Sequence, residues 1–233
     1  MSLCVIPARG GSKRIPRKNV REFSGRPMIS WSIRAALDSS IFDRVVVSTD
    51  DEHIREIAIS AGAEVPFMRP AEYSTDFAGT IPVVAHAIQS LGLDTGLVCC
   101  LYATAPFVES RDLVTGREAL ESVASADYAV AVTTYEFPIQ RALRSSADGR
   151  LRLFTPEYET SRSQDLEESW HDAGQFYWGR ASAWREQVPI FASGAVPVVL
   201  PRYRVQDIDT LEDWERAEWM FSALRRKKNE DVG

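Results

Sequence analysis

Apolar, strand-like runs alternate with helix-like segments through the first half of this 233-residue chain. Residues 3–6, 44–48 and 97–101 are short runs rich in valine, isoleucine and leucine, the composition of strands that are buried on both faces. Segments with helical periodicity separate them, and connections of this length join parallel strands by right-handed crossovers. The pattern predicts an α/β fold whose mostly parallel central sheet is covered by helices on both faces.

The remaining elements follow the same alternation. Helical patterns cover residues 27–37, 49–62, 80–91 and 110–122, and a further strand covers 128–133. The apolar pattern returns at residues 174–179 and 195–201, before a last helix that opens with a Thr-x-x-Asp capping sequence from Thr210 to Asp213. Because adjacent strand residues face opposite sides, we expect Cys99 and Cys100 on opposite faces of the sheet, as reduced core thiols.

The pattern changes between residues 135 and 172. A turn signal at Asp148-Gly149 predicts a hairpin or extended arm, and the polar, weakly periodic residues that follow predict a loop. We therefore expect one domain over residues 1–233 with a small inserted arm at about residues 135–172. Inserted arms rich in aromatic and charged residues often mediate dimer contacts, so a homodimer is the expected assembly.

Charge and composition argue against several classes of protein. The formal net charge of −6 disfavours non-specific binding to nucleic acids or anionic membranes. No apolar run approaches the roughly 18 residues of a membrane span, and the apolar run at the N-terminus is too short for a signal peptide. Three cysteines do not make a disulfide framework. These features predict a cytoplasmic protein with no nucleic-acid or membrane partner.

A basic loop that contains glycine follows the first predicted strand. The stretch VIPARGGSKRIPRKN, residues 5–19, holds two glycines, Ser12 and five cations in an otherwise acidic chain. Open α/β sheets bind ligands beyond the carboxyl ends of their strands, and glycine amides with lysine and arginine side chains suit phosphate groups. The loop has neither P-loop nor Gly-x-Gly-x-x-Gly spacing, so the competing interpretation is a solvated basic turn.

Two aspartates near the C-terminus are candidate ligands of a divalent cation. Asp207 and Asp209 are two residues apart, so on an extended segment both carboxylates face the same side. Mg²⁺ commonly takes one or two protein carboxylates and completes its shell with water and phosphate oxygens. The alternative is a solvated pair that caps the last helix. Asp50 and Asp51 are adjacent and diverge on a strand, so they are assigned to capping the next helix.

Other candidate groups carry less specific signals. Arg69 and residues 77–80 lie before or at the start of a predicted helix, where the backbone amides and Thr80 suit either a nucleotide or the helix cap, and both interpretations stay open. The three histidines show no zinc spacing. No Ser-His-Asp arrangement is recognisable, so a covalent hydrolase is not expected.

Five segments resemble those of the CMP-sialic-acid synthetases, the acylneuraminate cytidylyltransferases. They are VIPARGGSKRIPRKN, VVVSTDDEHI, VPFMRPAEYSTD, LYATAPF and VQDIDTLEDW, and in this order they extend over nearly the whole chain. The resemblance implies a Rossmann-like nucleotide-diphospho-sugar transferase fold with an inserted dimerisation arm. It also implies Mg²⁺-dependent transfer of CMP from CTP to a nine-carbon acidic sugar, with release of pyrophosphate.

The resemblance assigns roles to individual residues. Lys18 and Arg9 carry the reaction, and Asp207 and Asp209 hold the metal. The positions implied for CTP are Ala8, Arg9, Gly10, Gly11, Ser12, Lys18, Asn19, Arg69, Ala78 and Thr80, and those implied for the sugar are Tyr102, Ala103, Thr104, Arg162, Gln175 and Tyr177.

The other cations of the basic loop receive lesser roles. Lys13 assists in holding the phosphates, whereas Arg14 and Arg17 are assigned to the solvated surface.

Two departures from the sialic-acid enzymes bear on the sugar. Those enzymes have Gln-Pro-Thr-Ser-Pro where this chain has YATAP at residues 102–106, and His171 or Asp172 stands where an arginine is expected. A site that lacks the amide and the hydroxyl would leave polar groups of N-acetylneuraminic acid unpaired. The favoured substrate is therefore pseudaminic acid, which carries two acylamino groups and a terminal methyl.

Three alternatives remain open. The same chemistry could act on N-acetylneuraminic acid, legionaminic acid or Kdo. A metal-dependent glycosyltransferase of related fold would carry its Asp-x-Asp after a mid-chain strand, whereas here that pattern lies near the C-terminus. A nucleotide-binding module without activity would bind CTP and release no pyrophosphate.

Overall fold

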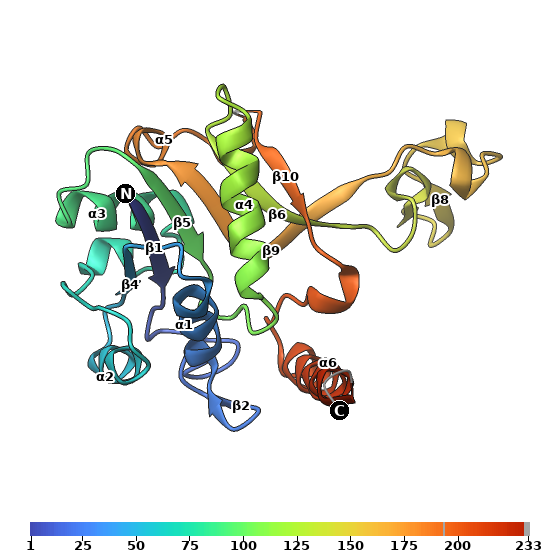
Figure 1. Ribbon diagram of the computed structural model, residues 1–233. Coiled ribbons are helices and arrows are strands. Elements are labelled where there is room, and N and C mark those ends of the chain that lie inside the picture. Colours follow the sequence, from blue (N-terminus) through green and yellow to red (C-terminus); the bar gives the residue numbers. More distant parts are fainter. Residues whose placement is uncertain (193, 231–233) are drawn as a thin grey trace.

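A six-stranded sheet forms the centre of the protein (Figure 1). The structure is a computed structural model that describes residues 1–192 and 194–230, so residue 193 and the last three residues of the predicted domain lie outside the described residues. β9 is antiparallel to both of its neighbours and the other pairs are parallel, which confirms the predicted α/β class. The strand order is β10-β6-β9-β5-β1-β4, with β1 at Ser2–Pro7, β4 at Arg44–Ser48, β5 at Leu97–Leu101, β6 at Tyr128–Thr134, β9 at Trp170–Arg180 and β10 at Val196–Val199.

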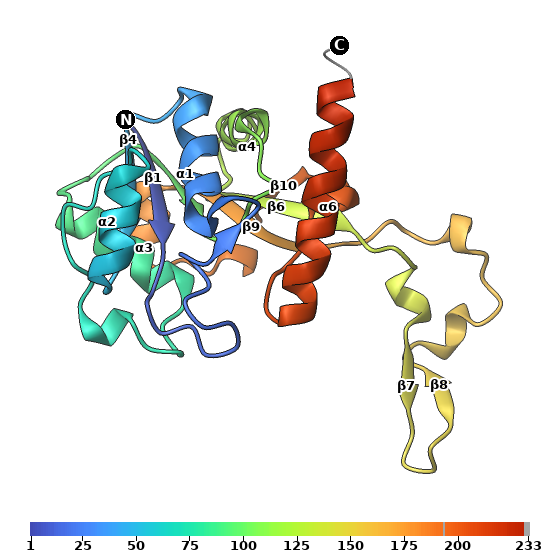
Figure 2. The same cartoon turned by 90° about the horizontal axis from the view of Figure 1, so that it is seen from below.

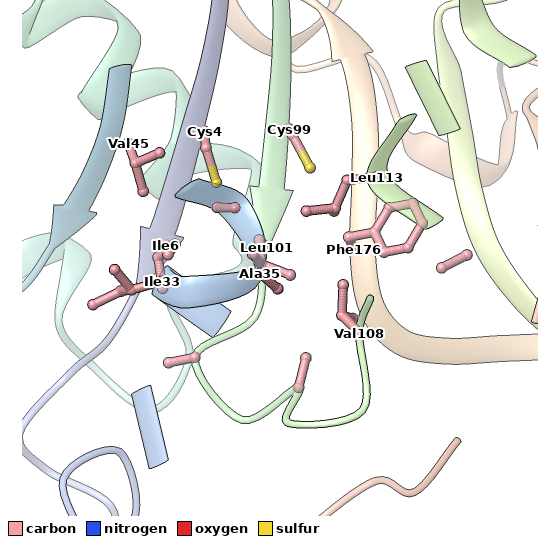
Figure 3. Close-up of a cluster of buried hydrophobic side chains, with 14 of the residues drawn as sticks. Cys4, Ile6, Ile33, Ala35, Val45, Cys99, Leu101, Val108, Leu113 and Phe176 are labelled. Atoms are coloured by element: carbon pink, nitrogen blue, oxygen red, sulfur yellow. The ribbon is translucent and has the colours of Figure 1, made fainter. Parts of the chain in front are cut away.

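Helices cover both faces of the sheet, and alternate strand residues point to the two sides. One buried cluster contains Cys4 of β1 and Cys99 of β5, which Figure 3 shows, while Cys100 lies in the cluster on the other face. The predicted opposite orientation of the two adjacent cysteines is therefore confirmed, and all three thiols are free. The first cluster is covered by α1 (Met28–Ser39), α2 (Glu52–Ser60) and α4 (Ser110–Ser122), and the second by α3 (Thr80–Ser90) and α5 (Ala181–Arg185).

Gly116 allows α4 to approach β9 closely. A Cβ atom at this position would lie 2.6 Å from Cδ1 of Trp178 and 2.8 Å from Cε2 of Phe176. Trp178 is itself held in place, because its indole N–H donates to the Leu113 carbonyl at 3.0 Å and its ring stacks on Phe42. A larger residue at position 116 must therefore displace the helix or the rings beneath it.

Between β6 and β9 the chain leaves the sheet as an arm of residues 135–169, which projects away from the core (Figures 1 and 2). Its hairpin pairs β7 (Leu143–Ser145) with β8 (Leu151–Leu153) and turns at Gly149, which has a φ of +76°. The predicted hairpin with its turn near Asp148-Gly149 is confirmed. The arm ends earlier than predicted, since residues 170–172 pair with β6; Trp170, His171 and Asp172 show no apolar alternation that indicates a strand.

A third buried cluster seats the C-terminal helix, α6 (Leu211–Glu230), against the segment between β1 and α1. Trp214 and Phe221 meet Phe23 edge-on, with ring centroids 5.5 and 5.3 Å apart. Phe23 belongs to β2 (Glu22–Phe23), which pairs with β3 (Arg26–Pro27). The predicted cap is confirmed, because the Thr210 hydroxyl accepts from the Asp213 N–H at 3.2 Å and the Asp213 carboxylate accepts from the Thr210 N–H at 2.8 Å. Neither α6 nor any other helix in the described part of the chain has the length and apolar character needed to cross a bilayer.

Candidate active site

A cavity of about 670 Å³ opens beyond the carboxyl ends of β1 and β5. Four segments line it: the basic loop after β1, the segment before α3, the loop after β5 and the segment before α6. This is the edge at which open α/β sheets bind their ligands. Many of the residues predicted for CTP, the sugar or the metal meet here: Arg9, Ser12, Lys18, Asn19, Arg69, Ala78, Thr80, Tyr102, Ala103, Thr104, Asp207 and Asp209.

The backbone of the basic loop is held by an aspartate at the end of β4. The Gly10 N–H donates to the Asp50 carboxylate at 3.0 Å, and a Cβ atom on Gly10 would lie 2.6 Å from Oδ2 of Asp51. Asp51 alone caps α2, where it accepts a backbone N–H at 2.9 Å. The assignment of Asp50 to the same cap was wrong, because the loop across the strand ends provides it with another donor. Gly10, Gly11 and the buried Ala8, predicted near CTP, support the loop without lining the cavity.

Asp76 bridges two cations of the basic loop from the opposite wall of the cavity. Its carboxylate lies 2.5 Å from Nη1 of Arg9 and 2.5 Å from Nζ of Lys13. Hydrogen bonds from Lys13 and Arg9 hold the pKa of Asp76 below its usual range, so the carboxylate is ionised at neutral pH. Sequence reasoning missed this residue, since its partners lie more than sixty positions earlier and a lone acid in the loop before α3 gives no local signal.

Lys18 joins the basic loop to the segment before α6. Its ammonium group donates to the Ile208 carbonyl at 2.5 Å and lies 3.3 Å from the Asp209 carboxylate. Arg14 donates to the same carboxylate at 2.8 Å and lines the cavity. Its side chain is 68% exposed, so it lies at the surface as predicted, but it also reaches a carboxylate 195 residues away in the sequence. Arg17 does not line the cavity and remains about half exposed.

Asp207 and Asp209 both line the cavity, and their properties fit a divalent cation. Partial desolvation and the charge of Asp209 raise the pKa of Asp207, so a cation beside the pair would favour the ionised form. In the part of the chain that the structure describes, no three His, Cys, Asp or Glu side chains are placed to hold a metal together. A pair of carboxylates matches the few protein ligands that Mg²⁺ takes when phosphate oxygens and water complete its shell.

Arg69 points to a polar ligand. Its side chain is only 3% exposed, and its Nε and Nη2 groups have no hydrogen-bond partner although they are buried. Burial lowers the pKa of this guanidinium, while Asp50, 3.8 Å away, opposes that shift. Buried donors without acceptors are costly, and this side chain lines the cavity. A ligand with oxygen acceptors would satisfy it.

Hydroxyl groups line the wall of the cavity near β5. The hydroxyls of Tyr102 and Thr80 lie 2.8 Å apart, and Tyr177 meets Tyr102 edge-on with ring centroids 5.6 Å apart. Burial raises the pKa of Tyr102 to about 12 and that of Tyr177 further, so both phenols are protonated at neutral pH. Thr80 does not cap α3, because Gly79 occupies the cap position. Tyr177 lines a second cavity of about 610 Å³ that shares Thr80 and Tyr102 with the first.

Two residues predicted to bind the sugar have other partners. Gln175 is buried and donates to the Arg204 carbonyl at 2.6 Å. Arg162 is exposed on the arm and pairs with Asp165 at 2.8 Å. Neither lines the two cavities, so their contacts with the sugar stay predictions.

A family model described as "Cytidylyltransferase" matches residues 3–164, more than half of the chain. The chain belongs to the cytidylyltransferase family. This confirms the class of enzyme that the five segments predict, a nucleotidyltransferase.

Relatives of this cytidylyltransferase act on acidic sugars, according to their names. Pseudaminic acid cytidylyltransferase of Campylobacter jejuni subsp. jejuni serotype O:2 is 45% identical over 94% of this chain and 96% of its own. CMP-N,N'-diacetyllegionaminic acid synthase of Legionella pneumophila is 33% identical over 93% of this chain and 94% of its own. The resemblance to the synthetases of CMP-activated sialic acids is confirmed.

A solved structure confirms the expected fold of this cytidylyltransferase. CMP:2-keto-3-deoxy-manno-octonic acid synthetase complexed with CTP superposes with a TM-score of 0.71 and covers 95% of this chain and 98% of its own. At 17% sequence identity the likeness concerns the fold alone.

Proposed function

We propose that this cytidylyltransferase activates pseudaminic acid, transferring CMP from CTP to the sugar and releasing pyrophosphate. The observation that carries the proposal is the 45% identity, over 94% of the chain, with the Campylobacter enzyme of that name. The cavity supports it, since cations, a buried arginine with unsatisfied donors and a carboxylate pair meet there. N,N'-Diacetyllegionaminic acid is the second candidate, because the Legionella relative is 33% identical over most of both chains.

The proposed chemistry is an in-line displacement at the α-phosphorus of CTP. The anomeric hydroxyl oxygen of the sugar forms a bond to that phosphorus, and the bond to the bridging oxygen of the β-phosphate breaks. Pyrophosphate leaves with the electron pair, and the hydroxyl proton is lost. Such transfers depend on positioning and on neutralised phosphate charge. Lys18, Arg9 and Lys13 supply positive charge along the loop, and Arg69 donates hydrogen bonds to the nucleotide.

Mg²⁺ is the proposed cofactor, with Asp207 and Asp209 as its protein ligands. When bound, it neutralises charge on the phosphate oxygens. Since Lys18 and Arg14 already contact Asp209, the carboxylate pair and the cations of the loop are in place around the same part of the cavity.

We also propose a homodimer that forms through the arm. In the hairpin, Leu143 pairs with Leu153 and Ser145 with Leu151, so the three leucines share one face. Leu143 and Leu151 are 56% and 71% exposed, and such grouped apolar exposure is typical of interaction surfaces. The cytoplasm, which supplies CTP, is the proposed location.

A pyrophosphate-release assay tests the substrate. CTP and Mg²⁺ are combined with pseudaminic acid, legionaminic acid, N-acetylneuraminic acid or Kdo in separate reactions. We expect the highest kcat/KM with pseudaminic acid. Release with legionaminic acid instead would favour the second candidate, and release with none of the four would overturn the proposed function.

Variants link the activity to the cavity. Lys18→Ala is expected to lower kcat roughly a hundredfold, the usual effect of removing one group that neutralises transition-state charge. Asp209→Ala should abolish the Mg²⁺-dependent rate, and retention of that rate would show that the metal assignment is wrong. Arg17→Ala is the matched control, because this cation of the same loop does not line the cavity.

A further inference from the structure

Asp172 presents a carboxylate beside the second cavity with no cation to neutralise it. Its Oδ1 accepts the Gly174 N–H at 2.8 Å, and its Oδ2 accepts the Tyr177 hydroxyl at 2.5 Å. The residue is exposed, and within the described ranges no lysine, arginine or histidine side chain pairs with it. A carboxylate has about four acceptor sites, so two remain for other donors.

The carboxylate also determines that the neighbouring Tyr177 hydroxyl acts as a donor toward it. An ionised carboxylate only accepts hydrogen bonds, so the Tyr177 hydroxyl must donate its proton to Asp172. Tyr177 is buried and lines the cavity with Tyr102 and Thr80. Its phenolic oxygen therefore turns lone pairs, not a proton, toward the cavity. Tyr177 and Asp172 are therefore hydrogen-bond acceptors at this end of the site, next to the Tyr102 and Thr80 hydroxyls.

The chemistry of the substrate determines which groups of the sugar face these acceptors. In a 2-keto sugar acid such as pseudaminic acid, the carboxylate is attached to the anomeric carbon, so it must lie near the phosphates and their cations when the anomeric hydroxyl reacts. The rest of the sugar extends away from them. The second cavity continues past Thr80 and Tyr102 toward Tyr177, so it is positioned for the far end of the sugar. That end carries acylamino N–H and hydroxyl groups, which are donors.

We propose that Asp172 is a specificity-determining residue: with Tyr177 it accepts hydrogen bonds from N–H or O–H groups at the far end of the acidic sugar and repels any sugar that turns its carboxylate there. The inference rests on the proposed function and deepens it. A bend in the pairing brings the side chain to this place, because the register between β6 and β9 shifts between Val130 and Val132, and Val132 is the partner of Asp172. Because the carboxylate has a fixed position, sugars whose N–H or O–H groups can reach it bind more tightly than stereoisomers that place these groups elsewhere.

The test compares the wild-type enzyme with Asp172→Asn, which keeps the size and removes the charge. Loss of a hydrogen bond to a charged acceptor should raise the KM for pseudaminic acid about tenfold or more. We expect kcat to change by less than about threefold, because the lost interaction stabilises the bound sugar and the transition state equally. The KM for CTP should stay constant. The kcat/KM ratio of pseudaminic over legionaminic acid should fall. Tyr177→Phe should shift the same ratio in the same direction.

The control is Glu168→Gln, which removes one negative charge from an exposed residue of the same approach to β9. It should leave all parameters unchanged. If Asp172→Asn leaves the KM for the sugar and the ratio unchanged, or lowers every parameter together with the melting temperature, the inference is overturned. Wild-type enzyme that releases pyrophosphate with no sugar overturns the proposed function itself. If the wild-type enzyme is active and Asp172→Asn has the same KM for the sugar and the same kcat/KM ratio, only the role of Asp172 is overturned.

Discussion

Asp76 forms ion pairs with Arg9 and Lys13, and its negative charge occupies the place that a phosphate group would take beside them. A triphosphate that enters the cavity must compete with this carboxylate for both cations. The three side chains are partly exposed, so water and salt weaken each pair. Asp76 therefore reduces the affinity of the loop for anions in general, and a polyphosphate with several contacts overcomes it.

Removing the charge of Asp76 should strengthen nucleotide binding. For Asp76→Asn we expect CTP to bind about two- to tenfold more tightly, the modest effect of freeing two partly exposed pairs. Isothermal titration calorimetry with CTP measures it. Asp94→Asn makes the same charge change at an exposed residue outside the cavity and should have no effect. Weaker binding by Asp76→Asn would mean that the carboxylate positions Arg9 for the nucleotide.

At the scale of single residues, the sequence predicted the cavity residues that belong to a recognisable local pattern. It missed those that reach the cavity only through contacts between distant parts of the chain. The basic loop was recognisable because its glycines and cations follow one another directly after a strand. Asp50 was misassigned, and Asp76 and the contact of Arg14 with Asp209 were missed, because the partners are distant in the sequence and only the fold brings them together.

At the scale of elements, the contact of α4 with β9 depends on the missing side chain at position 116. Gly116→Ala improves helix propensity by about 1 kcal/mol, yet its methyl group would overlap the rings of Trp178 and Phe176. Overpacking a buried contact of this kind costs roughly 1–3 kcal/mol. We expect a net loss of stability, measured as a lower midpoint in urea unfolding.

A neighbouring substitution separates propensity from packing. Thr115 is exposed on the same helix, so Thr115→Ala gains propensity without a clash and should raise the midpoint slightly. If Gly116→Ala behaved like Thr115→Ala, the close approach of α4 to β9 would not limit the residue at this position.

Elements were predictable where periodicity is strong. Alternation of apolar residues identified the buried strands, and the Thr210 to Asp213 sequence located the start of α6. The start of β9 was placed too late, because Trp170, His171 and Asp172 lie where the strand leaves the core and no buried face imposes a pattern on them.

At the scale of the whole molecule, the arm has no evident role within a single chain. Its hairpin has a leucine face that is open to solvent and an opposite face with Arg144 and Arg152. A charge on the leucine face should prevent self-association, so Leu151→Asp is expected to elute with the mass of a single chain when the wild-type protein elutes as a dimer. Light scattering coupled to size exclusion measures the mass.

The opposite face of the hairpin supplies the control for this prediction. Arg144→Asp introduces the same side chain on the face opposite the leucines and should leave the dimer intact. A wild-type protein that is monomeric at micromolar concentration would contradict the proposed assembly, and a dimer of Leu151→Asp would place the interface elsewhere. The sequence indicated the arm through its change of composition, but no local pattern says which of its faces a partner covers.

The bond from Lys18 to the Ile208 carbonyl joins two residues that are 190 positions apart in the sequence. A chain is synthesised from its N-terminus, and domains fold as their residues emerge. The basic loop is therefore synthesised well before Asp207, Asp209 and the helix that follows them. A chain that stops before these residues would contain most of the sheet and one half of the nucleotide site. On the proposed function, a growing chain that has not yet reached Asp209 lacks the carboxylate pair, so we expect it not to consume CTP.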